Sequence, residues 1–274
     1  MYIVDLSMSK NWIDTHFHVF NAGVAVEGAR YVPQYSARLS DWIRLAEHVG
    51  VTRGVWVQPS FLGTDNSLMI EALESHPDKL RGIAVVSPDV SIETLKTLHQ
   101  SGVRGIRLNL SGVSHEIPEW TQADTLWETL HALNWHLEIH TDQGKLPHAL
   151  SQLPSDVTLV IDHMGKPLEA RSSDPTLLSL KKRASLVPVH VKLSGAYRLG
   201  SVNPDRLASL LLNEMGPRAL LWGSDWPCTN HEQFGHFETL MTQAHGWIGA
   251  ESFEQVLLHN PTRLYWGPLS SMPL

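Results

Sequence analysis

Short hydrophobic runs alternate with longer amphipathic stretches along most of the chain. Eight of these runs are rich in apolar and β-branched residues, and polar residues and then helical spacing follow them. This alternation is typical of parallel βα units. It predicts strands over residues 12–18, 53–58, 81–86, 103–108, 136–140, 157–162, 189–193 and 220–224. Eight such units predict an α/β fold of the (β/α)8 class, the TIM barrel.

The segments between the predicted strands add detail to this architecture. Residues 40–47 have helical spacing, and Ser40 is expected to cap the N-terminus of that helix. Residues 21–38 show no clear period, and we expect a loop or lid over the first strand there. No internal repeat or linker-like change in composition divides the chain, so residues 1–274 are expected to form one barrel domain.

Composition excludes several classes of function. The net charge of -7 is spread without a basic cluster, so we expect neither nucleic acid nor a membrane as partner. One cysteine cannot form an intramolecular disulfide, and residues 1–12 lack the apolar core of a signal peptide. No apolar stretch reaches the length of a transmembrane helix. We therefore expect a cytoplasmic protein.

Two histidines stand one residue apart in the first predicted strand, within Asp14-Thr15-His16-Phe17-His18. On an extended strand, residues two positions apart point to the same face, so both imidazoles should converge while Phe17 points away. Such a pair also occurs as a structural feature in which backbone groups satisfy each ring. By itself the pair leaves the choice between a catalytic and a structural role open.

Three later strand ends each offer one further ionisable group, namely His140 in LEIHTDQ, His163 in LVIDHMGKP and Asp225 in LLWGSDWP. The carboxyl ends of all strands of an α/β barrel meet at one face, where the βα loops carry the chemistry. Burying such groups at one level is costly unless they pair or function. Their recurrence therefore favours a reaction centre.

These motifs also have a family likeness. The sequence resembles the amidohydrolase superfamily, and within it the branch that contains 2-pyrone-4,6-dicarboxylate lactonase and L-fuconolactonase-like hydrolases. The likeness spans nearly the whole chain. It rests on motifs in family order: DTHFHVF, GVRGIRLNL, EIHTDQ, VIDHMGKP, VKLSGAYR, LLWGSDWP and HNPTRLYW.

The resemblance implies a role for each matching residue. His16, His18 and His140 would surround the substrate carbonyl oxygen, Asp225 would be the base that activates water, and His163 would support the site or contact the substrate. The chemistry agrees, because N–H donors stabilise a developing oxyanion and a nearby carboxylate can take a proton from water.

The predicted site residues are compatible with one bound metal ion and also with no metal. His16, His18, His140 and Asp225 are an acceptable ligand set for one divalent metal such as zinc. The fourth predicted strand ends Arg107-Leu108-Asn109, without the lysine or glutamate that bridges two metals in binuclear relatives. The lactonase branch is known for working without a catalytic metal, so the resemblance implies that no cofactor is needed. A mononuclear site remains the alternative.

Cationic residues near the predicted mouth indicate an anionic or polyhydroxylated substrate. Arg107, Lys166 and Arg198 are candidates to hold a carboxylate, and Tyr197 can add a hydroxyl donor. Arg104 lies three positions before Arg107, and residues three apart point to opposite faces of a regular strand. Arg107 is therefore the better candidate, with a salt bridge that closes the barrel as its alternative role.

Together these observations predict a hydrolase that opens a small-molecule lactone, with Asp225-activated water and histidines that polarise the carbonyl. The main alternative is a zinc-dependent decarboxylase, or another mononuclear metal-dependent hydrolase of the same superfamily. A non-catalytic barrel that binds a metabolite is a further alternative. The sequence leaves the identity of the lactone, the pathway and the oligomeric state open.

The cysteine and the other histidines are expected to be bystanders. Cys228 follows Trp226-Pro227, where relatives often carry a histidine, and no base stands beside it in the sequence, so it is not expected to be a nucleophile. Surface or helix-face positions are expected for His115, His131, His136, His148, His231, His236 and His259.

Overall fold

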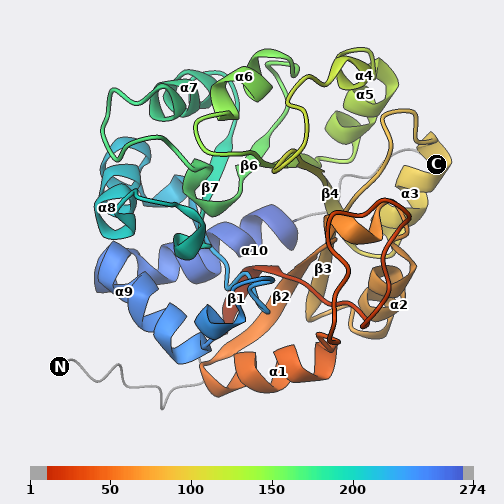
Figure 1. Cartoon of the computed structure of the whole chain (residues 1–274), viewed down its shortest axis with the longest axis horizontal. Coiled ribbons are helices and arrows are strands. Elements are labelled where there is room, and N and C mark those ends of the chain that lie inside the picture. Colours follow the sequence, from red (N-terminus) through yellow and green to blue (C-terminus); the bar gives the residue numbers. More distant parts are fainter. Residues whose placement is uncertain (1–10, 268–274) are drawn as a thin grey trace.

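The computed structural model describes residues 11–267. The expected absence of a signal peptide concerns the first residues of the chain, and residues 1–10 lie outside the described part. Eight parallel strands follow one another around the sheet in chain order, with helices on the outside (Figure 1). The strands are β1 (Trp12–Phe17), β2 (Val51–Val57), β3 (Leu80–Ala84), β4 (Val103–Asn109), β5 (His136–His140), β6 (Leu159–Ile161), β7 (Val189–Leu193) and β8 (Leu220–Trp222). The predicted TIM barrel is confirmed.

Helices connect successive strands and cover the sheet. They are α1 (Leu39–His48), α2 (Ser67–Ser75), α3 (Ile92–Gln100), α4 (Pro118–Thr121), α5 (Asp124–Ala132), α6 (Leu146–Ser151), α7 (Pro175–Ala184), α8 (Pro204–Met215), α9 (Phe237–Glu254) and α10 (Asn260–Tyr265). Among the described residues, no helix is both long and apolar enough to cross a membrane.

The seam between β1 and the end of β8 closes the barrel. The Asp225 N–H donates to the His16 carbonyl at 2.8 Å, and the His18 N–H donates to the Trp226 carbonyl at 2.8 Å. The buried carboxylate of Asp14 also accepts hydrogen bonds from the Ser224 N–H and hydroxyl, at 2.9 and 2.6 Å. These contacts fix the height at which the ends of the two strands meet.

All eight predicted strands exist, and their ends differ by up to two residues. β5 and β7 have the predicted bounds, whereas His18, Asp162 and Ser224 lie just beyond the last residues of β1, β6 and β8. These residues follow the strands where the chain leaves the ladder at the barrel mouth, so their side chains belong to the loops that form the mouth.

The expected cap of the first helix is wrong. The N-cap position of α1 is Arg38, which makes no side-chain cap hydrogen bond, and Ser40 lies inside the helix. The N–H groups of Asp41 and Trp42 both donate to the Arg38 carbonyl. The first helical turn therefore begins before the serine, which cannot act as the cap.

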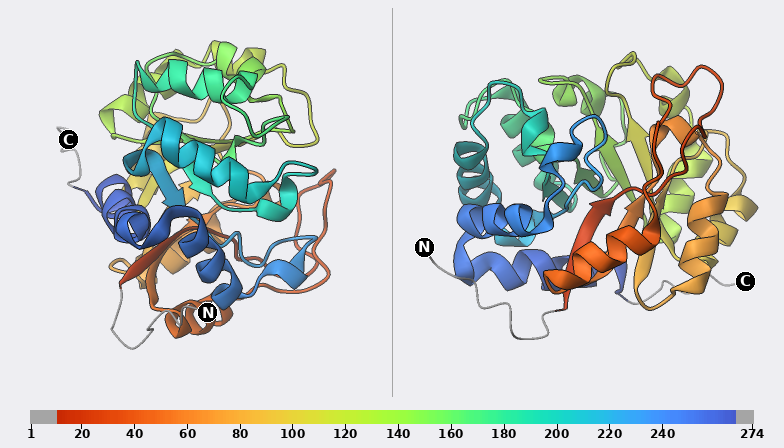
Figure 2. Two further views of the ribbon diagram at one scale, coloured as in Figure 1. Left: turned by 90° about the vertical axis from the view of Figure 1, so that its left-hand side faces the viewer. Right: turned by 60° about the horizontal axis from the view of Figure 1, so that its bottom comes forward.

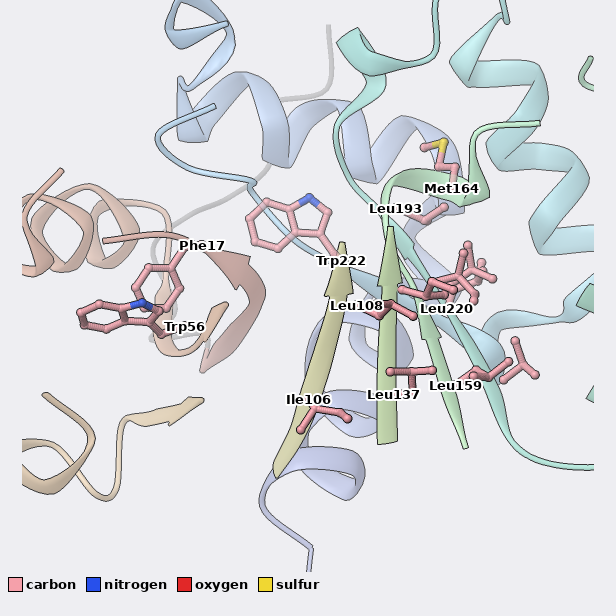
Figure 3. Packing of buried hydrophobic residues seen from close by; sticks show 14 of the residues in the cluster. Phe17, Trp56, Ile106, Leu108, Leu137, Leu159, Met164, Leu193, Leu220 and Trp222 are labelled. Carbon is pink, nitrogen blue, oxygen red and sulfur yellow. The ribbon is translucent and has the colours of Figure 1, made fainter. Parts of the chain in front are cut away.

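Apolar side chains fill the space between strands and helices. Nine of the ten tryptophans are buried, so they form core rather than an exposed face. The Phe17 ring stacks on Trp42, with ring centroids 4.0 Å apart. It also lies against Trp56, and Leu137 and Leu159 project from neighbouring strands (Figure 3). A smaller cluster holds Val55, Val57, Ile83, Val160, Leu221 and Tyr265 of α10.

Residues 21–38 form an irregular segment after β1, as expected. Phe20 and Ala37 pair across its base, so the segment leaves the barrel and returns beside its own start. It projects beyond the strand ends on the same side as the loop after β8 (Figure 2). This placement makes it one wall of the barrel mouth.

Candidate active site

A cavity of about 610 Å³ opens at the carboxyl ends of the strands. The ends of all eight strands contribute to its lining, together with the segment 21–38. Six of the predicted site residues line this cavity: His18, Arg107, His140, His163, Arg198 and Asp225. The structure therefore brings most of the predicted site residues to one place.

His18 and Asp225, on the floor of this cavity, form a tight group with His16, which is fully buried beside them and does not line the cavity. The two Nε2 atoms lie 3.2 Å apart, and Asp225 Oδ1 lies 3.6 Å from His16 Nε2 and 3.4 Å from His18 Nε2. His18 Nδ1 donates to the Val57 carbonyl at 2.7 Å, because a carbonyl oxygen can only accept. The lone pair of His18 Nε2 therefore faces His16 and the aspartate.

The carboxylate of Asp225 is held by one oxygen and free at the other. Oδ2 accepts hydrogen bonds from the Tyr197 hydroxyl at 2.6 Å and from Arg198 Nε at 2.8 Å. Oδ1 is buried and has no hydrogen-bond donor among the described residues. Burial alone would raise the pKa of Asp225, but the charge of Arg198 holds this pKa well below its ordinary value. Asp225 is ionised at neutral pH.

His140 and His163 complete the floor of the cavity. Their rings meet edge to face with centroids 4.7 Å apart, and His163 Nδ1 lies 3.0 Å from the Ser194 hydroxyl. Neither ring nitrogen of His140 has a hydrogen-bond partner among the described residues. Burial lowers the pKa of His163 to about 3 and that of His140 well below its ordinary value. Both imidazoles are neutral at neutral pH, and His140 is free to bind a ligand.

A fully buried network of charges lies beneath the histidines. Arg107 donates to Asp162 Oδ2 through Nε at 3.3 Å and Nη2 at 3.0 Å. Lys192 donates to Glu138 Oε2 at 2.5 Å and lies 3.5 Å from Asp162 Oδ1. Lys192 Nζ also lies 3.0 Å from His16 Nδ1. The site thus has two layers, with a polar floor open to the cavity and a paired ionic layer below it.

The cationic residues that the sequence placed near the mouth have different positions in the structure. Arg107 lines the cavity but is paired with Asp162, so it makes the internal salt bridge that was the alternative to substrate binding. Arg104 donates to the His99 and Val103 carbonyls near the start of β4, away from the mouth. Lys166 is half-buried and does not line the cavity.

Sequence reasoning missed the three charged residues of the lower layer. Glu138 stands two positions before His140 in β5, and Lys192 interrupts the apolar strand β7, so strand parity could have placed them inside the barrel. Asp162, the residue before His163, was passed over. The expected surface position of His136 is wrong, because its ring is fully buried at the start of β5, in contact with Tyr265.

Gly223, just after β8, allows the chain to approach β1 closely. A Cβ at this position would lie 2.6 Å from the Cβ of His16, closer than side-chain atoms pack. We expect Gly223→Ala to lower the free energy of unfolding by about 1–3 kcal/mol, because β1 must move to relieve the overlap. Urea unfolding measures this loss. Gly246→Ala in α9 has open space and should not destabilise the protein, and equal losses in both variants would contradict the expectation.

Three groups of side chains bring possible metal ligands together, and cations already occupy two of them. The groups containing Asp162 with His140 or with Glu138 face Arg107 and Lys192. The third group is His16, His163 and Asp225. Beside it, His16 Nε2, His18 Nε2 and Asp225 Oδ1 are separated by 3.2–3.6 Å, close to the roughly 3.3 Å edge of a tetrahedral zinc site.

The spacing of these three atoms fits a single ion, but their hydrogen bonding does not. Lys192 is only a donor, and its contact with His16 Nδ1 requires the proton of this ring to be on Nε2. A protonated Nε2 has no lone pair for a metal. The residues as arranged therefore do not fit a metal ion.

Comparison with known proteins places this architecture among hydrolases. Residues 13–266 match the model of a family described as amidohydrolase. The chain is 32% identical over 280 residues to the 2-pyrone-4,6-dicarboxylate hydrolase of Comamonas testosteroni, with 93% of this chain and 90% of that protein covered. It is 28% identical over 274 residues to the 4-sulfomuconolactone hydrolase of Hydrogenophaga intermedia, with 92% and 88% covered.

A solved structure shares both the fold and part of the sequence. It is that of a provisionally assigned 2-pyrone-4,6-dicarboxylic acid hydrolase from Pseudomonas putida, with a TM-score of 0.81 and 35% identity. The alignment covers 94% of this chain and 98% of that one. The likeness therefore includes the whole barrel and all of its strand ends.

Proposed function

The chain belongs to the amidohydrolase family, and from its site we propose that it hydrolyses a small anionic lactone. One observation carries this proposal above the others. The ionised Asp225 keeps Oδ1 unbonded at the floor of an open cavity, directly beside the imidazoles of His16 and His18. A carboxylate placed in this way can take a proton from water while adjacent N–H groups stabilise an oxyanion.

The substrate class follows from the cavity and from the named relatives. Those relatives act, by name, on a pyrone dicarboxylate and on a sulfonated muconolactone, both of which are anionic. Arg198 lines the cavity and donates from Nε to Asp225 and from Nη2 to the Thr229 carbonyl, while Nη1 makes no hydrogen bond among the described residues. We assign Arg198 to the attraction of a carboxylate or sulfonate, whereas Arg107 is committed to its pair with Asp162. Tyr197 would support Asp225 through its 2.6 Å hydrogen bond, whereas we assign no substrate contact to Lys166, which does not line the cavity.

The proposed reaction uses groups whose protonation the site fixes. Water between Asp225 Oδ1 and the lactone carbonyl gives its proton to the carboxylate as its oxygen attacks the carbonyl carbon. His140, whose ring nitrogens have no other partner among the described residues, donates an N–H group to the oxyanion, and His163 can contact the ring. His18, whose Nδ1–H is bonded to Val57, offers Nε2 as an acceptor that orients His16.

Collapse of the tetrahedral intermediate completes the ring opening. The bond between the carbonyl carbon and the ring oxygen breaks, and the proton held by Asp225 passes to the leaving oxygen. The product is a hydroxy acid, or an oxo acid when the leaving group is an enolate. Such a site suits activated esters, because neutral histidines polarise a carbonyl less than a divalent cation does.

A panel of lactones tests the proposal. We expect chelator-treated protein of measured metal content to hydrolyse anionic pyrone or enol lactones. We also expect it to act at least about 10-fold more slowly on their neutral methyl esters, because a hydrogen bond to a charged group contributes about 1.5–3 kcal/mol. The readouts are kcat/KM for ring opening and carbon dioxide release from aromatic acids. Release of carbon dioxide without lactone turnover would overturn the proposal in favour of a decarboxylase.

A further inference from the structure

The ammonium group of Lys192 is buried beneath His16, at the centre of the barrel. Its side chain is 0% exposed, and its three donors face His16 Nδ1, Glu138 and Asp162. A buried lysine is costly unless each donor finds an acceptor. Two of these neighbours are carboxyl groups, and the ionised Asp162 offsets the charge of the lysine. The third is an imidazole of the proposed reaction centre.

The contact with Lys192 determines which nitrogen of His16 carries the proton. A lysine ammonium donates and never accepts, so His16 Nδ1 accepts this hydrogen bond and the ring proton is on Nε2. Asp162 Oδ1 and Glu138 Oε1 lie 3.2 and 3.4 Å from Nδ1. Both contacts are longer than the 3.0 Å contact with Lys192, and neither has hydrogen-bond geometry.

The neighbouring histidine has the complementary arrangement. His18 carries its proton on Nδ1, because this atom is bonded to the Val57 carbonyl at 2.7 Å. Its Nε2 therefore accepts, and it lies 3.2 Å from the protonated Nε2 of His16. The hydrogen bonds run in one direction from Lys192 through His16 and His18 to Val57. Each donor in this chain has an acceptor.

We propose that Lys192 is a positioning residue that holds the proton of His16 on Nε2. The His16 N–H is then donated to His18, which orients the His18 ring toward a substrate in the cavity, and the pair does not offer two lone pairs to a divalent metal. The first consequence rests on the proposed lactone hydrolysis, whereas the second concerns metal binding alone.

The charges around the His16–His18 pair also oppose the binding of a divalent metal. A metal ion bound to His16 Nε2 would require a proton on Nδ1, which would end the 3.0 Å hydrogen bond from Lys192 and have to be directed at Asp162 Oδ1 at 3.2 Å instead. On the other side of the pair, Arg198 already neutralises Asp225 through a 2.8 Å contact. A divalent cation would therefore lie between two fixed positive charges, and this repulsion weakens its binding.

Nitrogen NMR of histidine-labelled protein tests the proton position directly. Two-bond correlations between ring nitrogens and carbon-bound protons distinguish the two neutral tautomers, and His16→Gln identifies the signal. We expect a protonated Nε2 for His16 in the unaltered protein. A protonated Nδ1 would overturn the inference, and this measurement does not depend on whether a Lys192 variant folds.

Zinc titration of the chelator-treated protein supplies the second readout. We expect the double variant Lys192→Met, Glu138→Gln, which removes the buried cation and keeps the size of its hydrogen-bond partner, to bind one zinc ion about 10- to 100-fold more tightly than the unaltered protein. Lys181→Met, on the exposed face of α7, is the matched control and should leave zinc affinity unchanged. Tight stoichiometric zinc binding by the unaltered protein would overturn the inference.

The two proposals fail in different ways. Lactone turnover with His16 protonated on Nδ1 would leave the proposed function intact and remove the role of Lys192. Absence of lactone turnover with His16 protonated on Nε2 would remove the proposed function and leave the role of Lys192 in proton placement and metal affinity.

Discussion

Replacement of Asp225 by asparagine is expected to lower kcat for lactone hydrolysis by about 10³-fold, within the range attributed to a lost general base. The amide keeps the size of the side chain, but it cannot accept the proton of water. Its oxygen can still accept from Tyr197 and Arg198, so the fold should persist. The measurement is kcat with an anionic lactone, together with circular dichroism of the purified variant. Near-normal turnover would remove Asp225 from the chemistry.

Cys228 offers a matched control in the same loop. It is fully buried three residues after Asp225 and does not line the cavity. Burial and the charge of Asp225 raise the pKa of its thiol to about 12, so it is not a nucleophile at neutral pH. We expect Cys228→Ala to keep kcat within a small factor. A large loss in this variant would show that any change in the loop disrupts turnover.

Acid is expected to destabilise the protein strongly between pH 7 and pH 5. Burial lowers the pKa of five enclosed histidines below the ordinary value of 6.5, so only the unfolded chain takes up their protons as the pH falls. Each contributes a loss of up to about 2 kcal/mol over this range. The five are His16, His136, His140, His163 and His190.

The raised pKa values of Glu138 and Asp14 act in the opposite direction. Burial makes the folded protein hold protons on these carboxyls where the unfolded chain does not, and this stabilises the fold as the pH falls. The offset from Glu138 is about the size of one histidine contribution. The net expectation is a loss of several kcal/mol, measured by urea unfolding at pH 7, 6 and 5.

His190 provides a control for the assignment of this effect. It lies on the outer side of β7, away from the cavity, and burial followed by the charge of Arg263 lowers its pKa to about 4. His190→Gln should reduce the slope of stability against pH by about one proton, or about 1.4 kcal/mol per pH unit. Equal stability at pH 7 and pH 5 in the unaltered protein would contradict the whole account.

The fold was accessible from the sequence because its evidence is local. Strand and helix patterns follow one another in chain order, and in this barrel the order in space is the same. The strand ends were harder to place, as the short β6 and β8 show, because a strand ends where its neighbour stops pairing. The misplaced cap at Ser40 has a similar origin, since the Arg38 carbonyl begins the helix two residues earlier.

The candidate site could be predicted only in part. His16, His18, His140 and Asp225 stand at strand ends with recognisable motifs, and the structure brings their side chains to one floor. Lys192, Glu138 and Asp162 have no such motif. A charged residue within a strand can face solvent or the barrel interior, and burial decides between these.

The sequence by itself determined the order of the strands, the residues at their ends and the family likeness. Only the tertiary structure decided the partner of each ionisable group: Arg198 and Tyr197 at Asp225, Arg107 at Asp162, and Lys192 at His16. The reason is that protonation depends on distances of a few ångströms between groups far apart in the chain. His16 and Lys192 are separated by 176 positions, and their 3.0 Å contact exists only in the closed barrel.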